Sequence, residues 1–172
     1  MIILSGPIGD HGIAVLAARG ELGFETDVES DVAPLNHLVE TILSVSPDSI
    51  HVLRDPTRGG LATTLNEIAC QSQAGIVIRE PDIPVHPAVT AVCEMLGFDP
   101  LYVANEGKLV AIVDHNMADE VCLAMRNSLY GKDAVIIGEV QETPAGRVLM
   151  KTTIGSTRVV DMLSGEMLPR IC

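Results

Sequence analysis

The chain has 172 residues, a length that suits one domain with a substantial hydrophobic core. Hydrophobic residues make up 47% of it and aromatic residues only 2%, which argues against disorder and predicts an aliphatic core. Lys and Arg total 11 against 23 Asp and Glu, a formal net charge of −12. Because nucleic-acid binding needs clustered positive charge, this balance argues against a nucleic-acid partner, although it leaves room for a bound nucleotide.

The apolar run at the N-terminus is too short for a secretory signal or a membrane span. It covers residues 1–4 and is ended by Gly6 and Pro7. No other segment has the form of a signal or a span. We therefore expect a cytoplasmic protein without a membrane partner.

The four cysteines show neither a C-x-x-C pair nor the spacing of metal ligands, so the sequence predicts no metal site. Cys93 and Cys122 fall on apolar stripes of helical spacing and are expected in the core. The surroundings of Cys70 do not decide between core and surface. This pattern of cysteines suits a reducing compartment.

Hydrophobic periodicity predicts helices and strands that follow one another along the whole chain. In chain order these are a strand over 2–5, a helix around 13–17, a helix over 35–43, a strand over 50–54, a helix over 61–69, a strand over 75–79, a helix over 87–96, a strand over 109–113, a helix around 117–125, strands over 134–140 and 147–150, and a last strand within 152–161.

Proline and polar residues predict where some of these elements begin. Pro34 suits the first turn of the second helix and Pro87 the first turn of the fourth. Asn116 is the predicted cap of the fifth helix. The last strands before 152 are expected to pair with each other around the turn at 144–146. Such interleaving predicts an α+β fold, a layered α/β domain in which helices pack on a mixed sheet.

Beyond residue 162 the apolar periodicity ends, which predicts a domain over 1–162 and a flexible tail over 163–172. The last residue, Cys172, carries both a thiol and the terminal carboxylate. A thiol in this position has no chain beyond it to obstruct access, so it can enter another protein's active site or fold back into its own. The alternative is a frayed end that happens to finish in cysteine.

The segment 54–60 joins a predicted strand to a predicted helix and is rich in glycine and arginine. Glycines there free backbone N–H groups at the start of a helix, a combination that favours a phosphate. A capped turn with surface arginines is an equally good interpretation, and the loop is not a Walker A motif. The candidate phosphate contacts are Arg54, Asp55, Thr57, Arg58, Gly59 and Gly60.

A second junction of strand, glycine and helix covers residues 5–12. It lacks the G-x-G-x-x-G spacing of dinucleotide-binding proteins. Asp10 and His11 have the chemistry for acid–base work, but a helix cap is the favoured interpretation of Asp10.

Glu106 lies between Asn105 and Gly107, immediately before a predicted buried strand. A carboxylate at the mouth of a strand acts as a base if burial raises its pKa. The glycine allows a sharp turn or a close approach to a ligand. The competing interpretation is a solvated loop acid.

Several of these segments occur together in one known family. They are SGPIGDHG near the start, RDPTRGG, PVHPAV followed by CEMLGFDPLYVANEGK, then IGEV and the terminal PRIC. With them the chain resembles the C-terminal half of the HypE family of hydrogenase maturation proteins. That family belongs to the superfamily of aminoimidazole ribonucleotide synthetase and selenophosphate synthetase.

The resemblance implies a part in making the cyanide ligands of the iron in [NiFe]-hydrogenases. In this family the carbamoyltransferase HypF places a carbamoyl group on the sulfur of the terminal cysteine. ATP then drives dehydration of that S-carboxamide to a thiocyanate, and the cyano group passes to iron on the HypC–HypD complex. By motif, Cys172 would be the covalent carrier, Glu106 the base and the 54–60 loop a phosphate contact.

The resemblance also implies a preceding domain of similar size. That domain would supply most contacts to ATP and Mg²⁺ and much of a homodimer interface, so we expect this chain alone to be inactive. Two other hypotheses stand beside this one. In the first, the chain is a non-catalytic interaction module that presents Cys172 to maturation partners. In the second, it is a regulatory domain that binds an amino acid or a nucleotide.

Overall fold

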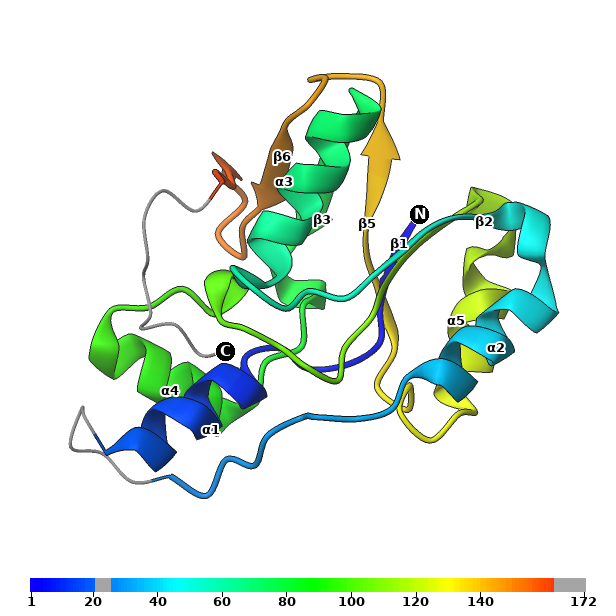
Figure 1. The fold of residues 1–172 in the computed structure, drawn as a ribbon. Helices are drawn as coiled ribbons and strands as arrows, with labels where there is room; N and C mark the ends of the chain where they lie inside the picture. Colours follow the sequence, from blue (N-terminus) through cyan, green and yellow to red (C-terminus); the bar gives the residue numbers. More distant parts are fainter. Residues whose placement is uncertain (21–25, 163–172) are drawn as a thin grey trace.

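The computed structural model describes residues 1–20 and 26–162. These residues form five α-helices and seven strands (Figure 1). Their order is β1 (Ile2–Leu4), α1 (Asp10–Arg19), α2 (Asn36–Val45), β2 (Ile50–Arg54), α3 (Gly60–Ser72), β3 (Gly75–Arg79), α4 (Pro87–Leu96), β4 (Val110–Val113), α5 (Ala118–Arg126), β5 (Val135–Gln141), β6 (Val148–Lys151) and β7 (Thr157–Val159).

The strands form one mixed sheet in the order β2-β4-β1-β5-β3-β6-β7. All neighbours are antiparallel except β3 and β6, which run parallel. The first strand of the chain thus lies inside the sheet, with Ile3 opposite Ala111 of β4 on one side and Ile136 of β5 on the other.

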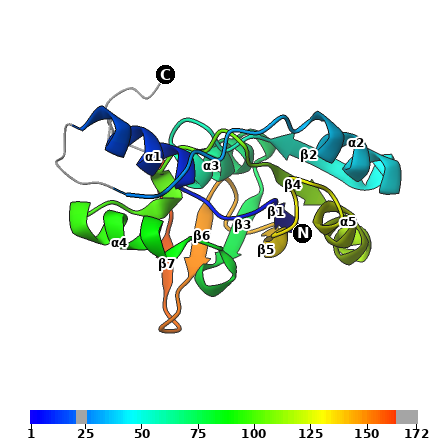
Figure 2. The same ribbon diagram turned by 90° about the horizontal axis from the view of Figure 1, so that it is seen from below.

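The two faces of the sheet are covered by different helices. Successive side chains of a strand point to opposite faces, so β1 contributes to both cores. Ile2 and Leu4 pack in a cluster with α3, whereas Ile3 packs with α2 and α5. Helices α1 and α4 form a third cluster, and Figure 2 shows them at the opposite side of the molecule from α2 and α5. This arrangement confirms the predicted α+β fold with helices packed on a mixed sheet.

Most predicted elements are present, but two helix starts are wrong. Helix α2 begins at Asn36 with Leu35 at its N-cap, so Pro34 precedes the helix. Helix α5 begins at Ala118, and Asn116 lies in a short 3₁₀ turn before it without capping the helix through its side chain. In both cases the pattern locates the helix correctly and misplaces its first turn.

The predicted pairing of β5 with β6 is also wrong, because β3 lies between them. The two strands run in opposite directions, as a hairpin would require, and the chain between them crosses the end of β3. Ile76 and Ile78 of β3 are 0% exposed and Val77 is 6% exposed. A strand that is buried on both faces lies inside the sheet rather than at its edge. The turn at 144–146 is local and does not indicate that β3 lies between β5 and β6.

Within the described residues, no helix is long and apolar enough to cross a membrane. Cys93 and Cys122 are buried, as predicted, and Cys70 is exposed. The predicted tail over 163–172, with Cys172, lies outside the described residues.

Candidate functional site

The glycines of the loop between β2 and α3 are explained by close packing inside the chain. Gly59 and Gly60 have φ of 69° and 62°, in the left-handed region that favours glycine. A Cβ on Gly60 would lie 2.5 Å from the Leu101 carbonyl oxygen and 2.6 Å from that of Val103. The Gly60 N–H donates to the Thr57 carbonyl at 3.1 Å and closes the turn. The loop is therefore held tightly against residues 101–103.

The charged residues of this loop have separate surroundings. Arg54 Nη2 donates to Glu67 Oε2 of α3 at 2.7 Å, which fixes its guanidinium along the helix. Asp55 and Arg58 are exposed. Arg58 is therefore the more accessible arginine of the loop.

The start of α3 lacks a side-chain cap. Gly59 occupies the N-cap and provides no side-chain cap. Among the described residues, no hydrogen-bond partner is found for the buried Oγ1 of Thr63 in the first turn. N–H groups at a helix start carry partial positive charge and favour phosphate oxygens.

Asn105 joins the two predicted site segments. It is 1% exposed, and its Nδ2 donates to the Pro56 carbonyl at 2.8 Å and to the Val103 carbonyl at 3.1 Å. Its Oδ1 accepts the Gly9 N–H at 2.8 Å. One buried amide thus ties the 54–60 loop and the start of α1 to the segment that carries Glu106.

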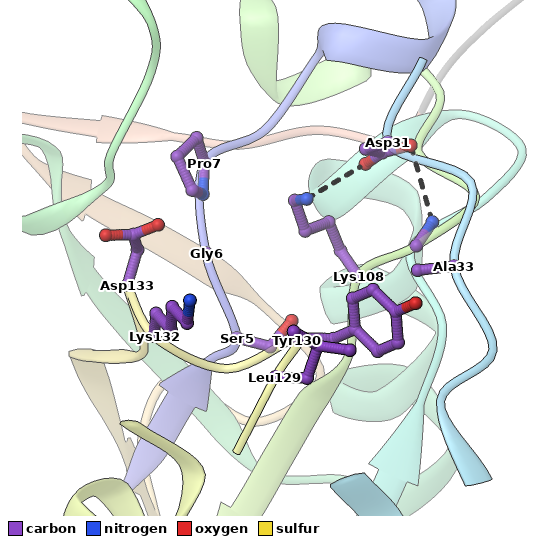
Figure 3. A pocket seen from close by; sticks show the side chains of 11 residues that line it. Ser5, Gly6, Pro7, Asp31, Ala33, Lys108, Leu129, Tyr130, Lys132 and Asp133 are labelled. Carbon is purple, nitrogen blue, oxygen red and sulfur yellow. Dashed lines mark hydrogen bonds and ion pairs between the residues drawn. The ribbon is translucent and has the colours of Figure 1, made fainter. Parts of the chain in front are cut away.

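Asp31 holds the segment that carries Glu106 from the other side. Its Oδ1 accepts the backbone N–H groups of Glu106 at 3.0 Å and Gly107 at 3.3 Å. Its Oδ2 lies 3.4 Å from Lys108 Nζ. Figure 3 shows the Lys108 side chain directed at Asp31. Gly107 serves a close approach to the chain's own backbone, since a Cβ there would lie 1.6 Å from the Asp31 carbonyl oxygen.

The favoured interpretation of Asp10 as the cap of α1 is wrong. Gly9, with φ of 91°, occupies the N-cap and Asp10 is the first helical residue. The carboxylate turns to His86, whose Nδ1 donates to Asp10 Oδ1 at 2.9 Å. Asp10 is buried and His86 is half-exposed. A separate contact joins His11 Nδ1 to Ser30 Oγ at 2.8 Å.

A pocket of about 180 Å³ lies beside the Glu106 segment. Lys108 and Asp31 form part of one wall, and Ser5, Tyr130 and Asp133 contribute to the others (Figure 3). Within the described residues, no group of three or more His, Cys, Asp or Glu side chains is placed to hold a metal ion.

The described cysteines differ in how readily they can ionise. Burial raises the pKa of the Cys93 thiol to about 11. Burial also raises the pKa of the Cys122 thiol, and Arg126 partly offsets this effect. Since the thiolate is the nucleophile, only a very small fraction of Cys93 is ionised and reactive at pH 8.

We therefore expect iodoacetamide at pH 8 to label Cys172 and Cys70 well before Cys93 and Cys122 in the folded protein. Peptide mass spectrometry after short exposure measures the order of labelling. A Cys70→Ser variant leaves Cys172 as the expected fast site. Equal labelling of all cysteines would contradict both the buried positions and the predicted exposure of Cys172.

Comparison with known proteins identifies the class. The family described as "AIR synthase related protein, C-terminal domain" matches residues 1–151. The chain belongs to this family. This agrees with the resemblance to the aminoimidazole ribonucleotide synthetase superfamily that its motifs indicated.

Within that class, the chain is similar to proteins named HypE, which confirms the resemblance drawn from its motifs. It is 57% identical over 171 residues to "Carbamoyl dehydratase HypE" of Cupriavidus necator, covering 99% of this chain and 48% of that protein. A crystal structure of the hydrogenase maturation protein HypE in complex with ATP has a TM-score of 0.91 at 48% identity, covering 99% of this chain and 52% of that one. A HypE–HypF complex gives 0.88 at 47% identity, covering 94% and 52%. The chain thus spans about half the length of the relatives it matches.

Sequence patterns missed three residues that organise this site. Asp31 lies in a segment without periodicity, so no local signal marks it. Asn105 and His86 lie in the family motifs, but distant residues give them their place: Asn105 contacts Gly9 and Pro56, 96 and 49 positions away, and His86 contacts Asp10, 76 positions away. The structure brings the 54–60 loop and the Glu106 segment together through Asn105, while Cys172 is outside the described residues.

Proposed function

We propose that the chain is the C-terminal half of an ATP-dependent carbamoyl dehydratase that acts in [NiFe]-hydrogenase maturation. The observation that carries this proposal is the 57% identity, over 99% of the chain, to a protein named carbamoyl dehydratase. The geometry supports it, because a glycine loop at an uncapped helix start and a carboxylate segment are tied to one buried asparagine.

The reaction requires the loss of one oxygen and two N–H protons from the S-carboxamide of Cys172. An amide oxygen is a poor leaving group. Transfer of a phosphoryl group from ATP to this oxygen allows it to leave as phosphate. The first N–H proton leaves as the oxygen is phosphorylated and the second as the C≡N bond forms and phosphate departs. The products are an S-cyanide, ADP and phosphate.

Three parts of the chain have roles in this scheme. Cys172 carries the carbamoyl group, and Glu106 accepts a proton from its nitrogen. The start of α3, with Arg58, contacts a phosphate group. Other ATP contacts and the sites for Mg²⁺ would come from the half of the relatives that this chain does not cover.

The proposed partners follow from the same chemistry. A solved complex of HypE with HypF supports a carbamoyltransferase as the donor to Cys172. The HypC–HypD complex as acceptor of the cyano group, and a homodimer of the full-length protein, complete the proposal. The proposed division is a domain over 1–162 and a carrier tail over 163–172.

The test uses a two-half protein, in which this chain is joined to a half that corresponds to the remaining length of its relatives. After incubation with the carbamoyltransferase, its substrates and ATP, intact-mass spectrometry should show a carbamoyl adduct and then the loss of one water. An adduct that never loses water in the presence of ATP would instead favour the non-catalytic interaction module.

The 172-residue chain alone should bind Mg-ATP weakly or undetectably. Its net charge of −12 repels ATP at low salt, and the 54–60 loop offers only part of a site. Isothermal titration calorimetry, with the two-half protein as the positive control, measures this. Micromolar or tighter affinity of the chain alone would show that the main nucleotide site lies within it.

A further inference from the structure

Asp31 has no role in the reaction scheme above, yet its side chain is almost fully buried. It belongs to the segment 26–35, a connection that precedes α2 and contains neither helix nor strand. Figure 1 shows this segment running across the molecule to α2. Asp31 lies where the connection meets the segment 106–108, and only 2% of its side chain is exposed.

The contacts of this carboxylate are concentrated on the Glu106 segment. Oδ1 accepts two consecutive backbone N–H groups, from Glu106 at 3.0 Å and from Gly107 at 3.3 Å. Oδ2 is within ion-pair distance of Lys108, whose side chain is 14% exposed. One side chain therefore contacts three successive residues, 75 to 77 positions further along the chain.

The backbone at Gly107 makes these contacts sterically feasible. A Cβ at this position would lie 1.6 Å from the Asp31 carbonyl oxygen and 3.0 Å from the Ala33 nitrogen. Glycine thus lets the two segments touch backbone to backbone, and the Asp31 carboxylate then reaches both N–H groups.

A buried carboxylate is costly unless hydrogen bonds and an opposite charge compensate it. In Asp31, Oδ1 accepts two hydrogen bonds. No hydrogen-bond partner is found for Oδ2 among the described residues, and its charge is compensated by Lys108. Hydrogen bonds to an ionised acceptor are about twice as strong as neutral ones, which makes them effective in holding an irregular loop. The backbone of Glu106 is consequently restrained on one side by Asp31 and on the other by its neighbour Asn105.

We propose that Asp31 is a positioning residue, which holds the backbone of Glu106 so that its side chain is aimed at the nitrogen of the S-carboxamide. The proposal rests on the proposed function for its chemical consequence. Its structural part, the restraint of the Glu106 and Gly107 N–H groups by Asp31, is independent of the proposed function. Bases act only from the correct geometry, and a displacement of about 1 Å is sufficient to cost about 10²-fold in rate.

The structural part is tested on the chain itself by amide hydrogen exchange. The Glu106 and Gly107 N–H groups should exchange at least about tenfold faster in Asp31→Ala than in the unaltered chain, while amides in β4 should be unchanged. The control is Asp133→Ala, which removes an exposed carboxylate from the same pocket. Equal exchange of both amides in Asp31→Ala and in the unaltered chain overturns the proposal whatever the activity.

The chemical part is tested by a double-mutant cycle in the two-half protein. Single-turnover loss of water from the S-carboxamide is followed by mass spectrometry in the unaltered protein, Asp31→Ala, Glu106→Gln and the double variant. Asp31→Ala should lower the rate by about 10- to 100-fold with unchanged carbamoyl acceptance and ATP affinity. In the Glu106→Gln background the same change should cost less than about threefold, because Asp31 acts through Glu106.

A loss that persists in full without the Glu106 carboxylate would overturn the positioning role. Should Asp31→Ala fail to fold, Asp31→Asn keeps the side-chain size and an acceptor oxygen; its rate should fall about three- to tenfold, again only while Glu106 is present. An unaltered two-half protein that accepts a carbamoyl group and never dehydrates it contradicts the proposed function instead, and amide exchange then decides the restraint by Asp31 separately.

Discussion

Replacing Cys172 with Ala in the two-half protein should abolish acceptance of the carbamoyl group, because the sulfur is the atom that carries it. No carbamoyl adduct and no loss of water should then appear in the intact mass. ATP affinity should be unchanged, since the proposed phosphate contact lies at the start of α3, far from the terminus in sequence. The effect should be complete, because no other side chain takes the place of a covalent carrier.

Cys70→Ala is the matched control, since Cys70 is the exposed cysteine of the described residues. This variant should accept and dehydrate the carbamoyl group at the unaltered rate. In cells, Cys172→Ala should prevent hydrogenase maturation, and Cys70→Ala should not. Normal maturation with Cys172→Ala would remove the carrier role and favour a regulatory domain with an irrelevant terminus.

Glu106→Gln should preserve carbamoyl acceptance and slow the dehydration by about 10²–10⁴-fold, the usual cost of losing a general base. Glutamine keeps the size of the side chain and its hydrogen bonding but cannot accept the proton. The two-half protein should therefore accumulate S-carboxamide, with little thiocyanate. The two species differ in mass by one water, so the same mass-spectrometric measurement separates them.

The control for this change is Glu94→Gln, at an exposed position on α4. It alters the net charge equally and should leave the rate unchanged. Dehydration at a near-normal rate in Glu106→Gln would exclude Glu106 from the mechanism, although the carrier role of Cys172 would stand.

Local patterns predicted the elements of the fold well because periodicity is a local property. The predicted bounds of β2, β3 and α4 coincide with the observed ones. Burial of Cys93 and Cys122 followed from the same stripes. Strand order did not follow, because the choice between a hairpin and an inserted β3 depends on which strand is buried on both faces.

The site shows the same division between local and distant information. Gly59 and Gly60 were expected to free N–H groups for a phosphate, and Gly107 to allow a sharp turn or a close approach to a ligand. The structure shows that all three lie close to other parts of this chain. Asp31 and His86 acquire their roles only through residues that the fold brings to them. An acid in an irregular segment looks like any solvated acid until its partner, 75 positions away, is known.

The inner position of β1 has a consequence for how the chain folds during synthesis. Both neighbours of β1, at residues 110–112 and 135–138, are made long after it. At about 5–20 residues per second, Ile2, Ile3 and Leu4 remain without their sheet partners for roughly ten seconds after leaving the ribosome. Pairings over such distances in the chain form slowly. Until these partners are made, β1 is an unpaired apolar strand, which is the kind of segment that chaperones bind.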